Sequence, residues 1–129
     1  MALTALNLSP EELKKYHPRE AFLRRRVETR LEVAKRRRRA MATAQRAAKL
    51  LKAEFDASEV ILFGSLARRE SFTLFSDIDL AARGIPPARY LAAMDAVLRL
   101  SAEFKIDLAE LETCPPALLK NIAKDGRLL

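Results

Sequence analysis

The apolar residues of the first half of the chain recur at helical spacing. Residues 19–55 contain no glycine or proline, and they are dominated by alanine, leucine, arginine, lysine and glutamate, which favour helix. Apolar residues recur there every three, four, five or seven positions, as one stripe along a helix would: Phe22, Val27, Leu31, Ala34, Met41, Ala44, Ala48, Leu51 and Phe55. The pattern predicts one long helix. At 1.5 Å per residue it would be about 50 Å long, so we expect part of it to project or to meet a partner.

A short helix is predicted ahead of this long one. Ser9 suits a helix N-cap, Pro10 the first helical position and Glu12 the third. The dipeptide His17-Pro18 interrupts that helix and begins the long one. We interpret His17, the only histidine, as part of this local structure and not as a ligand.

The second half of the chain alternates short apolar runs with helical segments. Three apolar runs are predicted to be strands: residues 60–63, 77–82 and 104–108. Helices are expected to open at Ser65, to span residues 88–101 and to run from Pro115 to near Gly126. The middle helix should carry its apolar residues on one side: Tyr90, Leu91, Met94, Val97 and Leu98. This order of elements predicts a small α/β (α+β) fold with helices packed on a sheet.

Charge divides the chain into two parts. At 129 residues, half hydrophobic and 32% charged, the chain suits one globular domain. Its net charge of +7 is uneven, since residues 1–58 hold 15 Lys/Arg against 7 Asp/Glu, and residues 59–129 hold 9 against 10. We therefore expect a basic helical arm at residues 1–56 and a core at residues 57–129, within one structural domain overall.

Composition also bears on where in the cell the protein is expected. No apolar run approaches the roughly 20 residues that span a bilayer, and the first ten residues lack the basic-then-apolar layout of a signal peptide. The single cysteine, Cys114, excludes an internal disulfide. We expect a cytoplasmic protein with no membrane partner.

Two carboxylates stand at i and i+2 in the second predicted strand. Because side chains alternate along a strand, Asp77 and Asp79 point the same way, roughly 7 Å apart. Like charges this close repel each other unless a cation is present. Carboxylates are ligands that Mg²⁺ accepts, so the pair predicts a site for one or two Mg²⁺ ions. By itself, an Asp-x-Asp is more often a solvated strand end.

A phosphate site is predicted at the end of the first strand. Gly64 lets a phosphate approach the backbone, and Ser65 offers its N–H and hydroxyl at the expected start of a helix. Arg68, one turn later, is placed to hold the outer phosphates. Ser76, directly before Asp77, is included with these nucleotide-binding residues. A lone Gly-Ser is usually a turn, so the order of the residues along the chain carries the prediction.

Asp107 is the third candidate acid. It lies in the otherwise apolar third strand, where a carboxylate can accept the proton of an attacking hydroxyl or bind a second metal ion. A lone aspartate in a strand is more often an edge residue whose hydrogen bonds are satisfied. A register shift of one residue would turn it away from the site.

At these residues the chain resembles the nucleotidyltransferases of the DNA polymerase beta superfamily, whose signature is Gly-Ser, a spacer and Asp-x-Asp. The Phe-Gly-Ser-x-Ala-Arg form of residues 63–68 is similar to the minimal nucleotidyltransferases, the MNT branch. Here 11 residues separate Ser65 from Asp77, one more than is common, and Arg69 replaces a usual glycine. Over residues 57–129 the resemblance implies a mixed sheet of the nucleotidyltransferase fold, with metal-binding aspartates and a third acid matching Asp77, Asp79 and Asp107.

Members of this branch are typically antitoxins of a helical HEPN ribonuclease toxin. The resemblance implies transfer of AMP from ATP to a hydroxyl of that toxin, a tyrosine in particular, with two Mg²⁺ ions and an oligomer formed with the partner. The chain would then be the antitoxin of a type VII-like toxin–antitoxin pair. Two alternatives stay open: an antitoxin that neutralises by binding alone, and a nucleotidyltransferase acting on a small molecule.

The basic runs of the long helix, residues 24–26 and 35–39, also invite a nucleic-acid interpretation. Consecutive charges spread around a helix, however, and no aromatic residues interleave with them to stack bases. We therefore favour a solvated helix or a docking surface for an acidic partner over contact with nucleic acid.

Overall fold

The computed structural model describes residues 18–129, so the helix expected at Ser9 and the position of His17 lie outside the described residues. The chain divides into two compact units, Met1–Glu32 and Val33–Leu129. Helix α2 (Pro18–Glu54) contributes to both, which confirms the predicted long helix. Within the first unit, residues 18–32 are all helical and exposed, including Phe22, Leu23, Val27 and Leu31.

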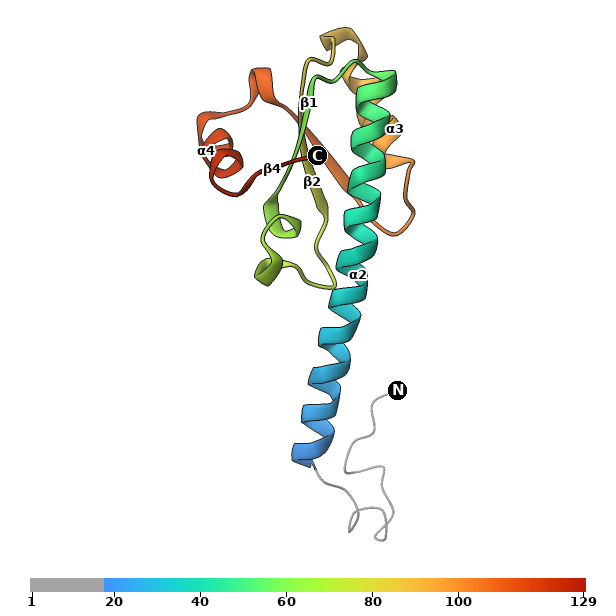
Figure 1. The fold of residues 1–129 in the computed structure, drawn as a ribbon, viewed down its shortest axis with the longest axis vertical. Helices are drawn as coiled ribbons and strands as arrows, with labels where there is room; N and C mark the ends of the chain where they lie inside the picture. The colour runs from blue at the N-terminus through green and yellow to red at the C-terminus, as the bar shows by residue number, and fades with distance from the viewer. Residues whose placement is uncertain (1–17) are drawn as a thin grey trace. The chain divides into compact units, whose positions relative to one another are not determined.

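A four-stranded mixed sheet forms the centre of the second unit (Figure 1). Its strands are β1 (Glu59–Phe63), β2 (Ile78–Arg83), β3 (Ile106–Glu110) and β4 (Arg127–Leu128). They lie in the order β3-β2-β1-β4. Strand β2 is antiparallel to β1 and parallel to β3, and β1 pairs with β4 in antiparallel fashion. The mixed sheet expected from the resemblance is therefore confirmed.

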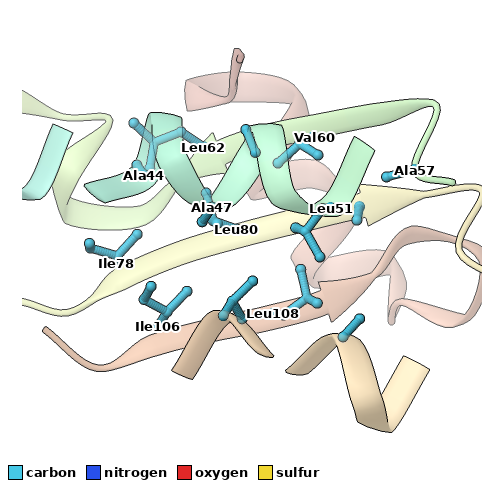
Figure 2. Close-up of a cluster of buried hydrophobic side chains, with 14 of the residues drawn as sticks. Ala44, Ala47, Leu51, Ala57, Val60, Leu62, Ile78, Leu80, Ile106 and Leu108 are labelled. Atoms are coloured by element: carbon cyan, nitrogen blue, oxygen red, sulfur yellow. The ribbon is translucent and has the colours of Figure 1, made fainter. Parts of the chain in front are cut away.

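One face of the sheet packs against the second half of α2 and against α3 (Tyr90–Leu98). The buried face of α2 is mostly alanine, which lets the helix lie close to the strands: Ala40, Thr43, Ala44, Ala47, Ala48 and Leu51. Figure 2 shows several of these side chains against alternate residues of the strands: Val60 and Leu62, Ile78 and Leu80, and Ile106 and Leu108. This two-residue alternation is the side-chain period of a β-strand.

The opposite face of the sheet is covered in part by α4 (Pro116–Asp125). A smaller apolar cluster lies there, centred on Ala81, Leu111 and Ile122. Ile61 and Phe63 of β1 pack against it from the strand side. Figure 1 shows α4 on the side of the strands away from α2 and α3. The three predicted strands and the last helix are thus present, with boundaries shifted by one or two residues.

Three local features differ from what the sequence predicted. The segment after β1 forms two three-residue 3₁₀ turns, Gly64–Leu66 and Arg69–Ser71, in place of the expected short helix. Leu91 and Leu98 of α3 are exposed, because its apolar face is centred on Ala93 and Val97. The two-residue strand β4 was not expected, since so short a run carries no periodicity.

Among the residues that the structure describes, no helix is both long enough and apolar enough to cross a membrane.

Candidate active site

The sheet places two of the candidate acids side by side. Strands β2 and β3 run parallel, and their register pairs Asp79 directly with Asp107. Their neighbours Leu80 and Leu108 are buried in the main core, so alternation turns both aspartates toward the opposite face, which α4 covers only in part. Asp79 is half-buried and Asp107 is exposed. The register thus brings together two carboxylates that are 28 residues apart in the sequence.

Gly64 lies against the Asp79 carboxylate. Phe63 at the end of β1 is the register partner of Asp79, and the chain then turns at Gly64 with a φ of +73°. A Cβ atom at Gly64 would overlap Oδ2 of Asp79 and would lie 3.1 Å from its Cγ. Glycine is required at this position for two reasons: the backbone is left-handed, and a side chain would collide with the carboxylate. The turn therefore places backbone that no side chain covers next to the carboxylate of Asp79.

Asp77 stands one residue before β2 and is partly buried. The pKa of Asp79 is raised above its usual range, chiefly because burial disfavours the charged form. The charges of Asp107 and Asp77 raise this pKa further, while Lys105 opposes them. The charges of Asp77 and Asp107 therefore both act on Asp79 at one end of β2 and β3.

In the part of the chain that the structure describes, Lys105 is the one basic residue that forms an ion pair with any of these three carboxylates. Its Nζ atom lies 3.6 Å from Oδ1 of Asp107, and both side chains are more than half exposed. An exposed pair of this kind contributes little to stability. Its effect on the pKa of Asp79 makes Lys105 part of the electrostatics of the site. The sequence offered no signal that singled it out.

The remaining nucleotide-binding candidates occupy the segments around the acids. Ser65 is partly buried in the turn Gly64–Leu66, where Leu66 is fully buried. Arg68 has an extended backbone, half of its side chain is exposed, and its Nη1 atom lies 3.9 Å from Oδ2 of Asp125 in α4. The backbone N–H of Arg68 donates to the Gly64 carbonyl at 3.3 Å, so the chain completes one turn there although no longer helix follows.

Ser76 closes the loop that leads into Asp77. Its hydroxyl accepts a hydrogen bond of 2.9 Å from the backbone N–H of Thr73 and lies 3.2 Å from the Thr73 hydroxyl. Its own backbone N–H donates to the Thr73 carbonyl. These contacts fix the loop before β2. They leave the Ser76 hydroxyl engaged in local structure.

The chemistry of the donor set suits a magnesium ion bound together with a triphosphate. Asp77, Asp79 and Asp107 supply hard oxygen ligands, and their mutual repulsion favours a cation. Within residues 18–129, no three His, Cys, Asp or Glu side chains converge closely enough to hold a metal ion by themselves. Mg²⁺ is commonly held by one or two carboxylates plus substrate phosphates and water. The residues therefore fit an ion that arrives with the nucleotide.

Two arginines missed by sequence reasoning reach this region from α2. Arg36 donates from Nη2 to the Ser76 carbonyl oxygen at 3.1 Å. Arg37 donates from Nη2 to the Leu66 carbonyl oxygen at 3.5 Å. Both belong to the basic run at residues 35–39, in which consecutive arginines look alike. Only the packing of α2 distinguishes the two that face the sheet.

Comparison with known families assigns the chain to one of them. Residues 45–129 match the family Polymerase beta, Nucleotidyltransferase. The match covers the four strands, the Gly-Ser turn and all three aspartates, and the chain belongs to this family. No curated protein is significantly similar to it in sequence.

Solved structures share the fold at low sequence identity. A mutant of the toxin–antitoxin MntA-HpeT superposes with a TM-score of 0.55 at 21% identity, covering 66% of this chain and 69% of that one. A toxin–antitoxin structure with AMP-PNP gives a TM-score of 0.55 at 19% identity, covering 66% and 70%. A tri-AMPylated Shewanella oneidensis HEPN toxin in complex with MNT antitoxin gives 0.51 at 18% identity, covering 69% and 70%. At these identities the likeness supports the nucleotidyltransferase fold of the chain.

Proposed function

We propose that this chain is a Mg²⁺-dependent nucleotidyltransferase that moves AMP from ATP to a hydroxyl of a partner HEPN toxin and thereby acts as its antitoxin. The observation that carries the proposal is the register of Asp79 with Asp107, next to the open backbone of Gly64. Family membership supports the reaction class. The toxin–antitoxin complexes that share the fold support the partner, and the AMP-PNP and AMPylated structures support the transferred group.

The reaction forms one bond and breaks one. The acceptor oxygen attacks the α-phosphorus of ATP, the bond between the α-phosphorus and the bridging oxygen breaks, and pyrophosphate leaves with that electron pair. Asp107, half exposed at the sheet face, is assigned to take the proton of the attacking hydroxyl. Asp77 and Asp79 are assigned to hold Mg²⁺, which when bound neutralises charge on the phosphates. Gly64, Ser65, Arg68 and Ser76 are the candidates to line the triphosphate site.

The first experiment follows the transferred group. Purified protein is incubated with Mg²⁺ and ATP labelled at the α-phosphate, with and without the helical protein encoded beside it. We expect label on that neighbour, and none when Asp77→Asn replaces the wild type. Asp95→Asn is the matched control, since Asp95 is an exposed aspartate of α3 that forms an ion pair with Arg99 four residues later. Label transfer by Asp77→Asn at the wild-type rate would contradict the assignment.

Neutralisation by binding alone is the second candidate function. It is favoured by the exposed apolar side chains of α2 in the first unit, Phe22, Leu23, Val27 and Leu31, which suit a protein contact. The discriminating experiment expresses an Asp77→Asn/Asp79→Asn variant in cells that produce the toxin. Full protection by this variant would favour masking, and loss of protection at equal abundance would favour chemistry. No label in the first experiment, together with no stable complex between the two purified proteins, would favour a small-molecule acceptor.

A further inference from the structure

Two basic residues of α2 differ from their neighbours in burial. Arg36 and Arg37 lie one turn before Ala40, the first fully buried residue of the helix. Both are partly buried, whereas Lys35 and Arg38 on either side are exposed. They also precede residue 45, where the family match begins, so membership of the family assigns them no role.

Arg36 joins the segments that lead into β2 and β3. Its Nη2 atom donates to the Ser76 carbonyl at 3.1 Å, and that carbonyl belongs to the peptide bond that enters Asp77. Its Nη1 atom lies 3.6 Å from Oε1 of Glu103, and its guanidinium carbon lies 4.5 Å from the centroid of the Phe104 ring. Only 16% of the Arg36 side chain is exposed. One guanidinium therefore contacts the approaches to both aspartate-bearing strands.

Arg37 reaches the third segment of the site. Its Nη2 atom donates to the carbonyl of Leu66 at 3.5 Å, and Leu66 ends the turn that contains Gly64 and Ser65. The two arginines together contact the segment after β1, the segment before β2 and the segment before β3. The first segment contains the Gly-Ser turn, the second contains Asp77, and the third leads into the strand of Asp107.

The cost of burying these side chains argues against a purely stabilising role. The Nε atoms of both arginines are buried without a hydrogen-bond partner. An unpaired buried N–H and a partly desolvated cation both lower the free energy of unfolding. An apolar side chain of similar length would fill either place without that loss. In exchange, the two arginines bind two backbone carbonyls of the site, and Arg36 also contacts Glu103 and Phe104 just before β3.

We propose that Arg36 and Arg37 are positioning residues for nucleotidyl transfer, which hold the Gly-Ser turn and Asp77 in fixed relation to each other. The inference rests on the proposed function, in which these two segments bind the triphosphate and its metal. A displacement of about 1 Å in a reacting group can lower a rate about 10²-fold. Loss of the two arginines should therefore affect turnover more than folding.

The test compares the variant Arg36→Met/Arg37→Met with Arg38→Met, which removes the exposed neighbouring charge. Hydrogen–deuterium exchange on the metal-free protein follows the amides of residues 64–77, and label transfer gives kcat and KM. In the double variant we expect faster exchange at residues 64–77, unchanged exchange in β1, and a fall in kcat of about tenfold or more. The KM for ATP should change less than kcat. The kcat of Arg36→Lys, which keeps a donor for the Ser76 carbonyl, should fall less than the kcat of Arg36→Met.

The other outcomes would overturn the positioning role, the proposed function, or both. Wild-type exchange and wild-type kcat in the double variant would overturn the positioning role, and so would an equal loss of kcat in Arg38→Met. If the double variant does not fold, the single variants Arg36→Met and Arg37→Met provide the same comparison. If the wild-type protein transfers no label, the proposed function fails instead. Unchanged exchange at residues 64–77, with unchanged affinity for Mg²⁺ and AMP-PNP, would then overturn the positioning role as well.

Discussion

The backbone of Gly64 and the carboxylate of Asp79 occupy adjoining space, so that a single methyl group added to the glycine would overlap Oδ2 of the aspartate. The two residues come from the two halves of one sequence motif. The antiparallel pairing of Phe63 with Asp79 brings them together. The spacer between the halves therefore has to return the chain from the end of β1 to the start of β2.

Replacing Gly64 with alanine should destabilise the protein and abolish transfer. A non-glycine residue in the left-handed region costs about 1–3 kcal/mol, and overlap with Asp79 adds to this at φ +73°. Chemical denaturation measures the loss. The variant Gly64→Ala/Asp79→Ala should recover the part due to overlap, because Oδ2 and Cγ are gone. Equal destabilisation by Gly64→Ala in both backgrounds would show that the carboxylate does not matter.

Asp79→Asn should stabilise the metal-free protein at neutral pH. Because the folded state raises the pKa of Asp79, the wild type keeps the proton where the unfolded chain releases it. The free energy of unfolding therefore falls as pH rises from the unfolded pKa through the folded one, and the loss persists above it. Asparagine removes this loss, so Tm in EDTA should rise by a few degrees, limited by solvent screening of a half-exposed group.

Excess Mg²⁺ with AMP-PNP should reverse that ranking. Ligands that bind only the folded state raise its stability, and the wild type retains the carboxylate proposed to hold the ion. Thermal unfolding with and without the ligand checks this. Asp95→Asn, on the exposed side of α3, should behave as the wild type in both conditions.

Lys105→Met should move the acidic limb of the transfer profile to higher pH. Lys105 lowers the pKa of Asp79, so its removal raises that pKa further. Asp79 has to be ionised to bind a cation, and activity should then begin at a higher pH. The pH dependence of kcat/KM measures the shift, with the exposed Lys49→Met as control. A shift to lower pH would contradict the electrostatic account of the site.

Leu51→Ala should destabilise the second unit by about 2–5 kcal/mol, since a fully buried leucine leaves a cavity when truncated. Leu91→Ala is the matched control, because Leu91 is 78% exposed and such surface changes usually stay within about 0.5 kcal/mol. Urea denaturation measures both. Comparable losses in the two variants would mean that α2 does not pack into the core as described.

The sequence predicted the parts of the site that depend on strand period. Alternation alone predicts that Asp77 and Asp79 point the same way, and the apolar neighbours of Asp107 correctly placed it on a strand. Its register with Asp79 required the pairing of β2 with β3, which no local pattern encodes. The same holds for Arg36 and Arg37, since a run of basic residues gives no indication of which members a sheet will bury.

Local propensity failed where tertiary contacts decide. The segment after β1 reads as a helix start, yet the approach of Gly64 to Asp79 and the burial of Leu66 end it after one 3₁₀ turn. On α3, Leu91 and Leu98 are apolar but exposed, because the helix packs on the sheet through the smaller side chains of Ala93 and Val97.

The alanine face of α2 sets how near that helix lies to the strands, and Arg36 extends from the same helix one turn before Ala40. A larger side chain at Ala44 or Ala47 would lift the helix and withdraw the guanidinium groups from the loops. Core substitutions that the fold survives should then emerge in a mutational screen as catalytic defects at normal protein abundance. In this protein, the distance between α2 and the sheet would determine how well the active-site loops are positioned.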